Sequence, residues 1–314
     1  MAMPSTIDVE QPEDAETTVN GVESVLREQV TTLQRSAERL SESSDAEAVH
    51  ELRGAARRLR SALKLYESSF PKRLQRRSSK ALKRLARVPD SLRTWDSHHE
   101  LLIRLYESAT DALEKAALEH VLEQVDEQRA SRRDELLDEL EDLDLPRLTA
   151  TLERLTKSTR GGKGGKRRLR EASKVIEKLI AGVGELPDQP FDSSVEDAQR
   201  ARAALRRLRH ALEVSEPSIE GLSPIAEPVK ELEQLLGDGL DRSRTLLLLE
   251  ERRAQLTSSE RKLLTDGLSH TIDRLMQERA GLAERFERLI RSFDGKKLAA
   301  DVRTALGLEP EALD

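Results

Sequence analysis

Cationic side chains recur at helical spacing in the stretch that begins at His50. At about 100° per residue on an α-helix, one group falls within an arc of roughly 80°: His50, Arg53, Arg57, Arg60 and Lys64. The opposite face of this helix carries leucine and alanine, so it can pack into a core while the first face presents about one cation per 5.4 Å turn. Such a ladder can bind a row of anionic groups through charge and N–H donors.

The next segment repeats this arrangement as a second basic helix. Its cations are Arg73, Arg76, Arg77, Lys80, Lys83, Arg84 and Arg87. With Arg58 and Arg93, the stretch from Leu52 to Arg93 contains fourteen lysines and arginines against two acids, a charge of +12 in a chain of total charge −6. A solvated helix face usually mixes signs through i,i+4 pairs, whereas like charges at this spacing repel. The run therefore favours a polyanion site, since a polyanion would relieve the repulsion.

The arginine pattern returns 149 residues later. Gln199, Arg202, Arg206, Arg207 and Arg209 stand at the positions of His50, Arg53, Arg57, Arg58 and Arg60. An offset close to half the chain length suggests an internal duplication. From this second half we expect phosphate contacts from the repeated arginines and from a basic helix after residue 165: Lys166, Arg167, Arg170, Lys174, Arg202, Arg206, Arg207, Arg209 and His210.

The aromatic residues discriminate between polyanions. The chain has one tryptophan, two tyrosines and four phenylalanines, and none stands among the ladder arginines. Proteins that hold single-stranded nucleic acid stack bases on aromatic side chains, and no helix-turn-helix, zinc-finger or RNA-recognition signature is present. Inorganic polyphosphate, which offers only phosphates, fits better than DNA or RNA. Three alternatives stay open: neutralisation of the ladders by the acidic N-terminus or residues 134–144, a helical adaptor for an acidic or phosphorylated protein, and a metal-dependent phosphohydrolase.

The sequence contains no recognisable catalytic or metal-binding constellation. The absence of cysteine excludes disulfides and thiolate chemistry, and the six histidines lack metal-site spacing. The glycine-rich stretch 160–166 fails as a phosphate-binding loop because Arg167 stands where Ser or Thr is required. We therefore expect a binding module and not an enzyme, without a cofactor or metal. His50 is expected to donate hydrogen bonds to phosphate, and Asp96, Asp238 and Asp241 to orient arginines or cap helices.

The elements that must position these residues are helices. Charged residues make up 36 % of the chain, the 3.6-residue period recurs, and no alternating β-branched runs are found, which together predict an all-α protein. We expect a disordered acidic segment (1–20), two helical halves (21–158 and 167–308), a glycine- and lysine-rich linker (159–166) and a tail (309–314). The repeat suggests two pseudo-symmetric antiparallel bundles of about four or more helices each. Our hypothesis is that both ladders line one basic groove between them.

Proline and glycine set the expected boundaries. Pro71 should separate the two basic helices, and Asp45 is a candidate N-cap of the first. A connection containing Pro217, Pro224 and Pro228 should precede a helix from Val229, with a weak point near Gly237 and Gly239. The N-terminus has no basic segment followed by an apolar core, and no apolar run approaches 18 residues, so we expect neither a signal peptide nor a transmembrane helix. We therefore expect a soluble, cytoplasmic protein without membrane contact.

Several of these residues resemble the signature of the CHAD family, the conserved histidine α-helical domain. The resemblance is carried by Val49-His50-Glu51-Leu52-Arg53 with Arg57-Arg58-Leu59-Arg60, by Arg93-Thr94-Trp95-Asp96, and by Arg206-Arg207-Leu208-Arg209-His210-Ala211-Leu212-Glu213. It covers about residues 22–308 and includes the block 232–241.

The resemblance implies two related helical bundles around a basic central groove, polyphosphate binding and association with polyphosphate granules. Family members are often fused to a triphosphatase domain with a Glu-x-Glu-x-Lys motif. No such motif occurs here, so a stand-alone member is implied. Three positions depart from the family pattern, because Gln199 replaces the second histidine, Thr94 an acid and His210 a tyrosine. These departures argue against a mechanism that needs two histidines or a metal.

Overall fold

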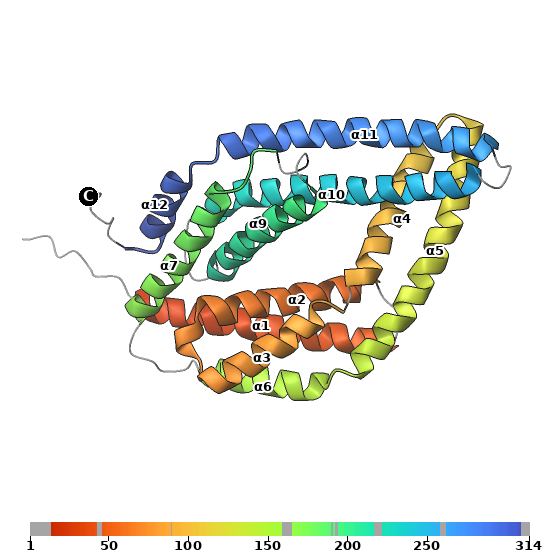
Figure 1. The fold of residues 1–314 in the computed structure, drawn as a ribbon. Helices are drawn as coiled ribbons and strands as arrows, with labels where there is room; N and C mark the ends of the chain where they lie inside the picture. Colours follow the sequence, from red (N-terminus) through yellow and green to blue (C-terminus); the bar gives the residue numbers. More distant parts are fainter. Residues whose placement is uncertain are drawn as a thin grey trace, which may run out of the picture.

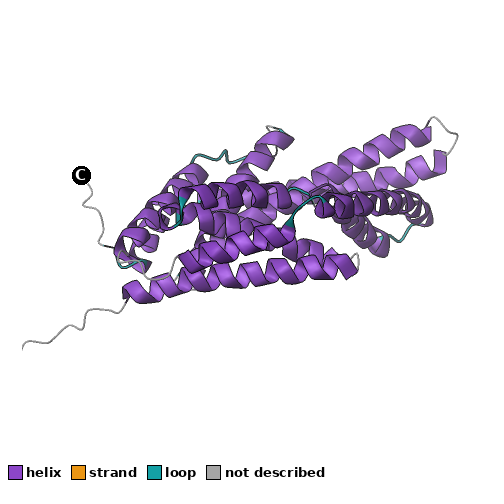
Figure 2. Ribbon diagram, turned by 90° about the horizontal axis from the view of Figure 1, so that it is seen from below, coloured by secondary structure: helices purple, strands orange, loops and turns teal. Residues whose placement is uncertain are grey.

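The structure is a computed structural model that describes residues 14–42, 46–88, 90–158, 165–189, 191, 194–216, 222–257 and 262–308. Every regular element within these ranges is helical, and Figure 2 shows no strand in the part of the chain that is described. The all-α prediction is therefore confirmed. The candidate cap Asp45, Pro217, and most of the expected acidic segment, linker and tail lie outside the described residues.

The first half of the chain forms six α-helices and one short 3₁₀ helix: α1 (Asp14–Glu42), α2 (Ala46–Leu65), η1 (Glu67–Ser69), α3 (Lys72–Leu85), α4 (Asp90–Ser108), α5 (Ala112–Glu141) and α6 (Leu145–Ser158). Pro71 stands directly before α3, as expected, because the ring that breaks one helix is tolerated at the start of the next. Asp111 caps α5, where its carboxylate accepts a hydrogen bond from the Glu114 backbone N–H at 2.9 Å.

The second half forms α7 (Gly165–Gly184), α9 (Val195–Ser215), α10 (Ser223–Thr257), α11 (Lys262–Arg291) and α12 (Gly295–Ala305). One expectation about this half is wrong, because Pro224 and Pro228 lie within α10 and not in a connection. Pro224 lies in the first turn, whose N–H groups have no partner inside the helix, and the helix continues through Pro228. The predicted helix from Val229 continues through Gly237 and Gly239, where the missing side chains admit close contacts from elsewhere.

Two hydrophobic clusters hold the helices together, and each draws on both halves of the chain. The larger cluster includes Leu52 and Leu59 of α2 together with Leu205 and Leu208 of α9. The smaller cluster joins the far parts of α4, α5, α10 and α11, which pack against one another as a four-helix group. In Figure 1, α10 and α11 run side by side along one long edge, and α4 and α5 connect their far end to the region of α2 and α6.

Positions about 150 residues apart have matching environments. Asp144 caps α6 by accepting from the Arg147 N–H at 3.0 Å, and Asp294 caps α12 by accepting from the Lys297 N–H at 2.9 Å. Buried residues also match, because Leu136 and Leu140 of α5 correspond to Phe286 and Ile290 of α11. The repeat noticed in the arginines therefore extends to caps and core positions.

Candidate anion-binding site

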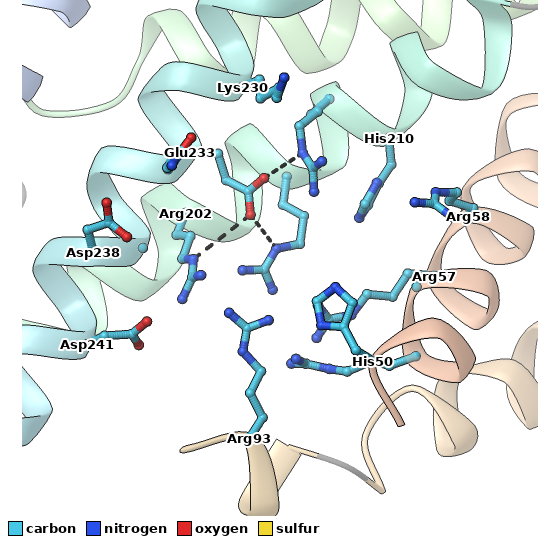
Figure 3. Close-up of a pocket in the computed structure, with 16 residues that line it drawn as sticks. His50, Arg57, Arg58, Arg93, Arg202, His210, Lys230, Glu233, Asp238 and Asp241 are labelled. Atoms are coloured by element: carbon cyan, nitrogen blue, oxygen red, sulfur yellow. Dashed lines mark hydrogen bonds and ion pairs between the residues drawn. The ribbon is translucent and has the colours of Figure 1, made fainter. Parts of the chain in front are cut away.

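Four helices from the two halves meet around a cavity of about 340 Å³. The N-terminal half of α2 and the first turn of α4 face α9 and the middle of α10, and α2 packs on α9. The cavity is lined by His50, Arg53, Gly54, Arg57, Arg58, Arg93, Arg202, Arg206, Arg209, His210, Lys230, Glu233, Gln234, Gly237, Asp238 and Asp241. Figure 3 shows Arg93, Arg202 and Arg57 converging from different helices on one space.

A second cavity, of about 260 Å³, shares part of this wall. Both cavities are lined by the arginines at positions 53, 57, 93, 202 and 206 and by Asp241. The second cavity adds Asp90, Thr94, Ser97, Gln199, Ala203, Leu240 and Arg244. Together the walls hold nine lysines and arginines against four acids, a net charge of +5 if the histidines are neutral. The ladder positions 53, 57, 202 and 206, far apart in sequence, thus form one basic site.

Two carboxylates of the protein lie among these arginines and pair with them. Glu233 accepts a hydrogen bond from Arg206 Nε at 2.7 Å, and its other oxygen lies 2.6 Å from Arg209 Nε. Asp90 pairs with Arg53 and, at 3.3 Å, with Arg57. By contrast, Glu135 of the acidic stretch 134–144 pairs with Arg132 on its own helix. The ladders are therefore partly neutralised inside the protein, by carboxylates that the sequence patterns did not single out.

Other donors in the site have no acceptor. Nε and Nη1 of Arg53 and Nε of Arg202 are buried and have no hydrogen-bond partner among the described residues. A buried polar group without a partner typically costs about 1–3 kcal/mol. The site therefore holds more hydrogen-bond donors than the protein's own carboxylates satisfy, and an oxyanion would supply the acceptors.

Burial and mutual repulsion weaken the charged forms of these side chains. Burial, together with the charges of neighbouring arginines, lowers the pKa of Arg53 to about 10, of Arg57 to about 9 and of Arg202 to about 10. The pKa of His50 is also lowered, by burial and then by Arg93 and Arg53. A bound anion would act in the opposite direction on every one of these groups.

His210 is held differently from His50. His210 is 8 % exposed, and its Nδ1 lies 3.1 Å from a carboxylate oxygen of Glu213. Burial lowers the pKa of His210, although the hydrogen bond with Glu213 opposes this effect. His50 is exposed at the edge of the cavity. The two histidines of the predicted site thus contribute one accessible and one buried ring.

The structure places many predicted site residues outside both cavities. Among these, Arg207 donates to the Ala203 carbonyl at 2.9 Å, and Arg167 pairs with Glu171 at 3.0 Å. The α3 residues are separated from the site because α3 packs beside α2 and α6 on the outside. The side chain of Lys166 lies outside the described residues. The predicted residues not found in the cavities are Arg60, Lys64, Arg73, Arg76, Arg77, Lys80, Lys83, Arg84, Arg87, Arg167, Arg170, Lys174 and Arg207.

Sequence reasoning named Asp238 and Asp241 of α10 as residues that orient arginines, but it missed the rest of one face of this helix. Lys230, Glu233, Gly237, Asp241 and Arg244 recur at intervals of three or four residues, so they share this face, and they line the two cavities. Such a polar stripe is itself a detectable signal on a predicted helix. Sequence reasoning overlooked this stripe because its charges are of both signs, as on an ordinary solvated helix face.

The described part of the chain contains no group of three or more His, Asp or Glu side chains that could hold a metal ion. No described helix combines the length and apolar character needed to cross a membrane. No Phe, Trp or Tyr is among the described residues that line the two cavities. The described cavity walls can therefore bind a ligand through charge and through N–H donors.

Comparisons with known proteins agree with this description. The family model for the CHAD domain matches residues 24–250. Two solved structures are similar over most of their length, each with a TM-score of 0.61. The CHAD domain from the plant Ricinus communis has 20 % identity and covers 91 % of both chains. PptA from Streptomyces chartreusis has 16 % identity and covers 88 % of this chain and 99 % of its own. No curated protein matches the sequence.

Proposed function

Because this chain belongs to the CHAD family, we propose that it binds inorganic polyphosphate in the cavities between α2, α4, α9 and α10. The observation that carries the proposal is the convergence of arginines from both halves on one site with unpaired buried donors. Arginine suits this role because its planar guanidinium donates two parallel hydrogen bonds to phosphate oxygens. The described cavity walls hold no Phe, Trp or Tyr on which bases could stack, which disfavours nucleic acid.

The two halves of the chain are related as a pseudo-symmetric pair in this proposal. Arg53 and Arg57 of α2 correspond to Arg202 and Arg206 of α9, and α2 packs directly on α9. The matching caps and core positions of the halves support the same relation. A duplicated helix whose copies face each other presents two rows of guanidinium groups to one linear polymer.

The outer cations extend the site for longer chains. Arg60 of α2 follows Arg57 by one turn, and its pKa is lowered by burial and then by the charge of Arg87, just beyond the end of α3. The basic face of α3 continues from there with exposed side chains. A polyphosphate chain that leaves the cavities along α2 therefore meets a further row of cations.

The protein acts as a binding module that associates with polyphosphate granules in the cytoplasm. The carboxylates of Glu233 and Asp90 serve to hold the arginines in place, since ion pairs to Arg206 and Arg57 restrict these long side chains before the polymer binds. A fluorescent fusion of the full chain should coincide with stained granules. Substituting Arg53 and Arg206 with alanine should disperse it.

The decisive experiment is a titration with long-chain polyphosphate at two salt concentrations. Binding should weaken steeply as salt increases, because each neutralised phosphate releases counterions, while DNA of equal charge binds much more weakly. Equal affinity for DNA would contradict the proposal. An acidic peptide that displaces polyphosphate at equal charge would favour the adaptor function, and phosphate release dependent on a divalent metal would favour the hydrolase.

A further inference from the structure

Gly237 lies on α10, where this helix faces the arginines of α9. A methyl group added to Gly237 would lie 2.7 Å from Nη2, 3.1 Å from Cζ and 3.3 Å from Nε of Arg202, which are its three nearest heavy atoms. The guanidinium of Arg202 therefore occupies the space that a side chain at this position would fill.

Glu233 holds Arg202 less closely than it holds the other two arginines. Glu233 lies 2.7 Å from Arg206 Nε and 2.6 Å from Arg209 Nε, but 3.9 Å from Arg202 Nε, which exceeds hydrogen-bond distance. Nε of Arg202 is buried and has no hydrogen-bond partner among the described residues. The space left by the missing side chain of Gly237 therefore helps to define where this guanidinium lies.

We infer that Gly237 is a positioning residue for polyphosphate binding: its missing side chain lets the Arg202 guanidinium lie against the backbone of α10 and line both cavities. The inference rests on the function proposed above. An alanine here would force Nη2 to move by roughly 0.7 Å to regain an ordinary contact of 3.4 Å. The displaced guanidinium would have to settle again among the charges of Arg206 and Arg93, which repel it, and of Asp241, which attracts it.

The first test is the Gly237→Ala variant of the full chain, titrated with long-chain polyphosphate. We expect about a tenfold loss of affinity, in the range of one weakened charge-assisted hydrogen bond. The salt dependence should become shallower by about one counterion. The melting temperature should stay equal or rise, because alanine favours a helix and the clashing group is the end of a flexible side chain.

A double-mutant cycle with Arg202→Ala tests whether Gly237→Ala lowers the affinity through the Arg202 guanidinium. Where position 202 is already alanine, adding Gly237→Ala should cause no further loss of affinity, because no guanidinium remains to be displaced. A loss of the same size in both backgrounds would overturn the inference, and so would unchanged affinity in the single variant.

Two other glycines serve as matched controls. A methyl group at Gly281 of α11 meets no atom within 4 Å, so Gly281→Ala should leave both affinity and salt dependence unchanged. At Gly239 it would lie 2.3 Å from the ring of Phe191, which packs edge-on against Phe286. Gly239→Ala should therefore lower the melting temperature, in contrast to Gly237→Ala.

Failure of the proposed function is distinguishable from failure of this inference. If the unmodified protein does not bind polyphosphate, the proposed function is wrong. The NMR resonance of the Arg202 Nε–Hε group in the free protein would still test whether Gly237 positions this side chain. Gly237→Ala should shift this resonance and Gly281→Ala should not. A resonance that is insensitive to Gly237→Ala would overturn the inference whatever the ligand.

Discussion

At the scale of residues, the proposed site combines strong cations with partners that satisfy only some of them. Arg53 pairs with Asp90, yet two of its three nitrogens remain buried without hydrogen-bond partners among the described residues. Arg206 is held by Glu233 and lines both cavities. Burial and like charge lower the pKa of Arg53 and Arg57, so the folded protein without a ligand carries a cost that an anion would remove.

Arg206→Ala should weaken polyphosphate binding by roughly 10- to 100-fold, the range for loss of a charged hydrogen-bond donor. The slope of log affinity against log salt should decrease by about one, measured by calorimetric titration at several salt concentrations. Arg288→Ala removes an exposed arginine of α11 that pairs only loosely with Glu284 at 3.9 Å, and should change neither value. Equal effects of both variants would mean that general charge, and not the site, drives binding.

His50 gives the binding a pH dependence whose sign follows from its surroundings. Burial and the nearby arginines lower its pKa from 6.5 in the free protein, and a bound phosphate chain would raise it. The bound form should therefore take up a proton, and affinity should increase as the pH falls from about 7.5 to 6.

Titrations in buffers of different ionisation enthalpy would measure this proton uptake directly. His50→Ala should abolish it, whereas His270→Ala, which removes an exposed ring on α11, should leave it intact. An affinity that is flat with pH in the unmodified protein would exclude His50 as a phosphate contact.

At the scale of elements, α2 and α9 supply most of the arginines of the site, and α10 adds further charged residues to its wall. The two arginine helices are amphipathic, so burial of their leucine faces turns the cationic faces toward each other. The α10 helix then adds Lys230, Glu233 and Asp241 from a face that mixes signs. The basic helix α3 contributes nothing to the cavities, because its contacts are with α2 and α6.

The position of α3 predicts a dependence on chain length. The triple variant Arg76→Gln, Lys80→Gln and Lys83→Gln should leave the affinity for tripolyphosphate unchanged, since these exposed side chains lie outside the cavities. It should reduce the affinity for long chains several-fold, because only these reach α3. A matched variant of Lys262, Arg285 and Arg288 on α11, also exposed, should affect neither ligand.

At the scale of the whole molecule, the halves are joined by packing and by a few buried polar contacts. His98 of α4 is buried, and its Nδ1 lies 2.8 Å from the hydroxyl of Thr245 on α10. Its ring also meets Trp95 edge-on at 5.6 Å. Desolvation lowers the pKa of His98 to about 4, so the folded protein holds this ring in its neutral form at neutral pH.

Acid should therefore destabilise the folded protein through His98. The folded-state pKa is below the unfolded value of about 6.5, so stability is unaffected above pH 6.5 and falls as the pH decreases towards 4. The full effect is about 3 kcal/mol, which urea unfolding at pH 7 and pH 5 would detect in part. His98→Gln should flatten this loss, and His270→Gln should not.

Much of the fold was predictable because helices are local. Pro71 separates α2 from α3 as predicted, although α2 already ends at Leu65. The start of α10 was predicted wrongly because proline was read as a break, although Pro224 lies in the first turn and the helix continues through Pro228. Only part of the site was predictable, because charge in the sequence does not reveal which faces meet.

The sequence by itself determined the all-helical class, the duplicated rows of arginine and the chemistry that these rows can perform. All three follow from composition and from a period of 3.6 residues, which a short stretch of chain already contains. Only the tertiary structure decided that Arg53, Arg57, Arg202 and Arg206 converge, that Glu233 stands among the arginines and that α3 lies apart. The physical reason is that contacts between residues about 150 positions apart depend on how the helices pack, which no local pattern specifies.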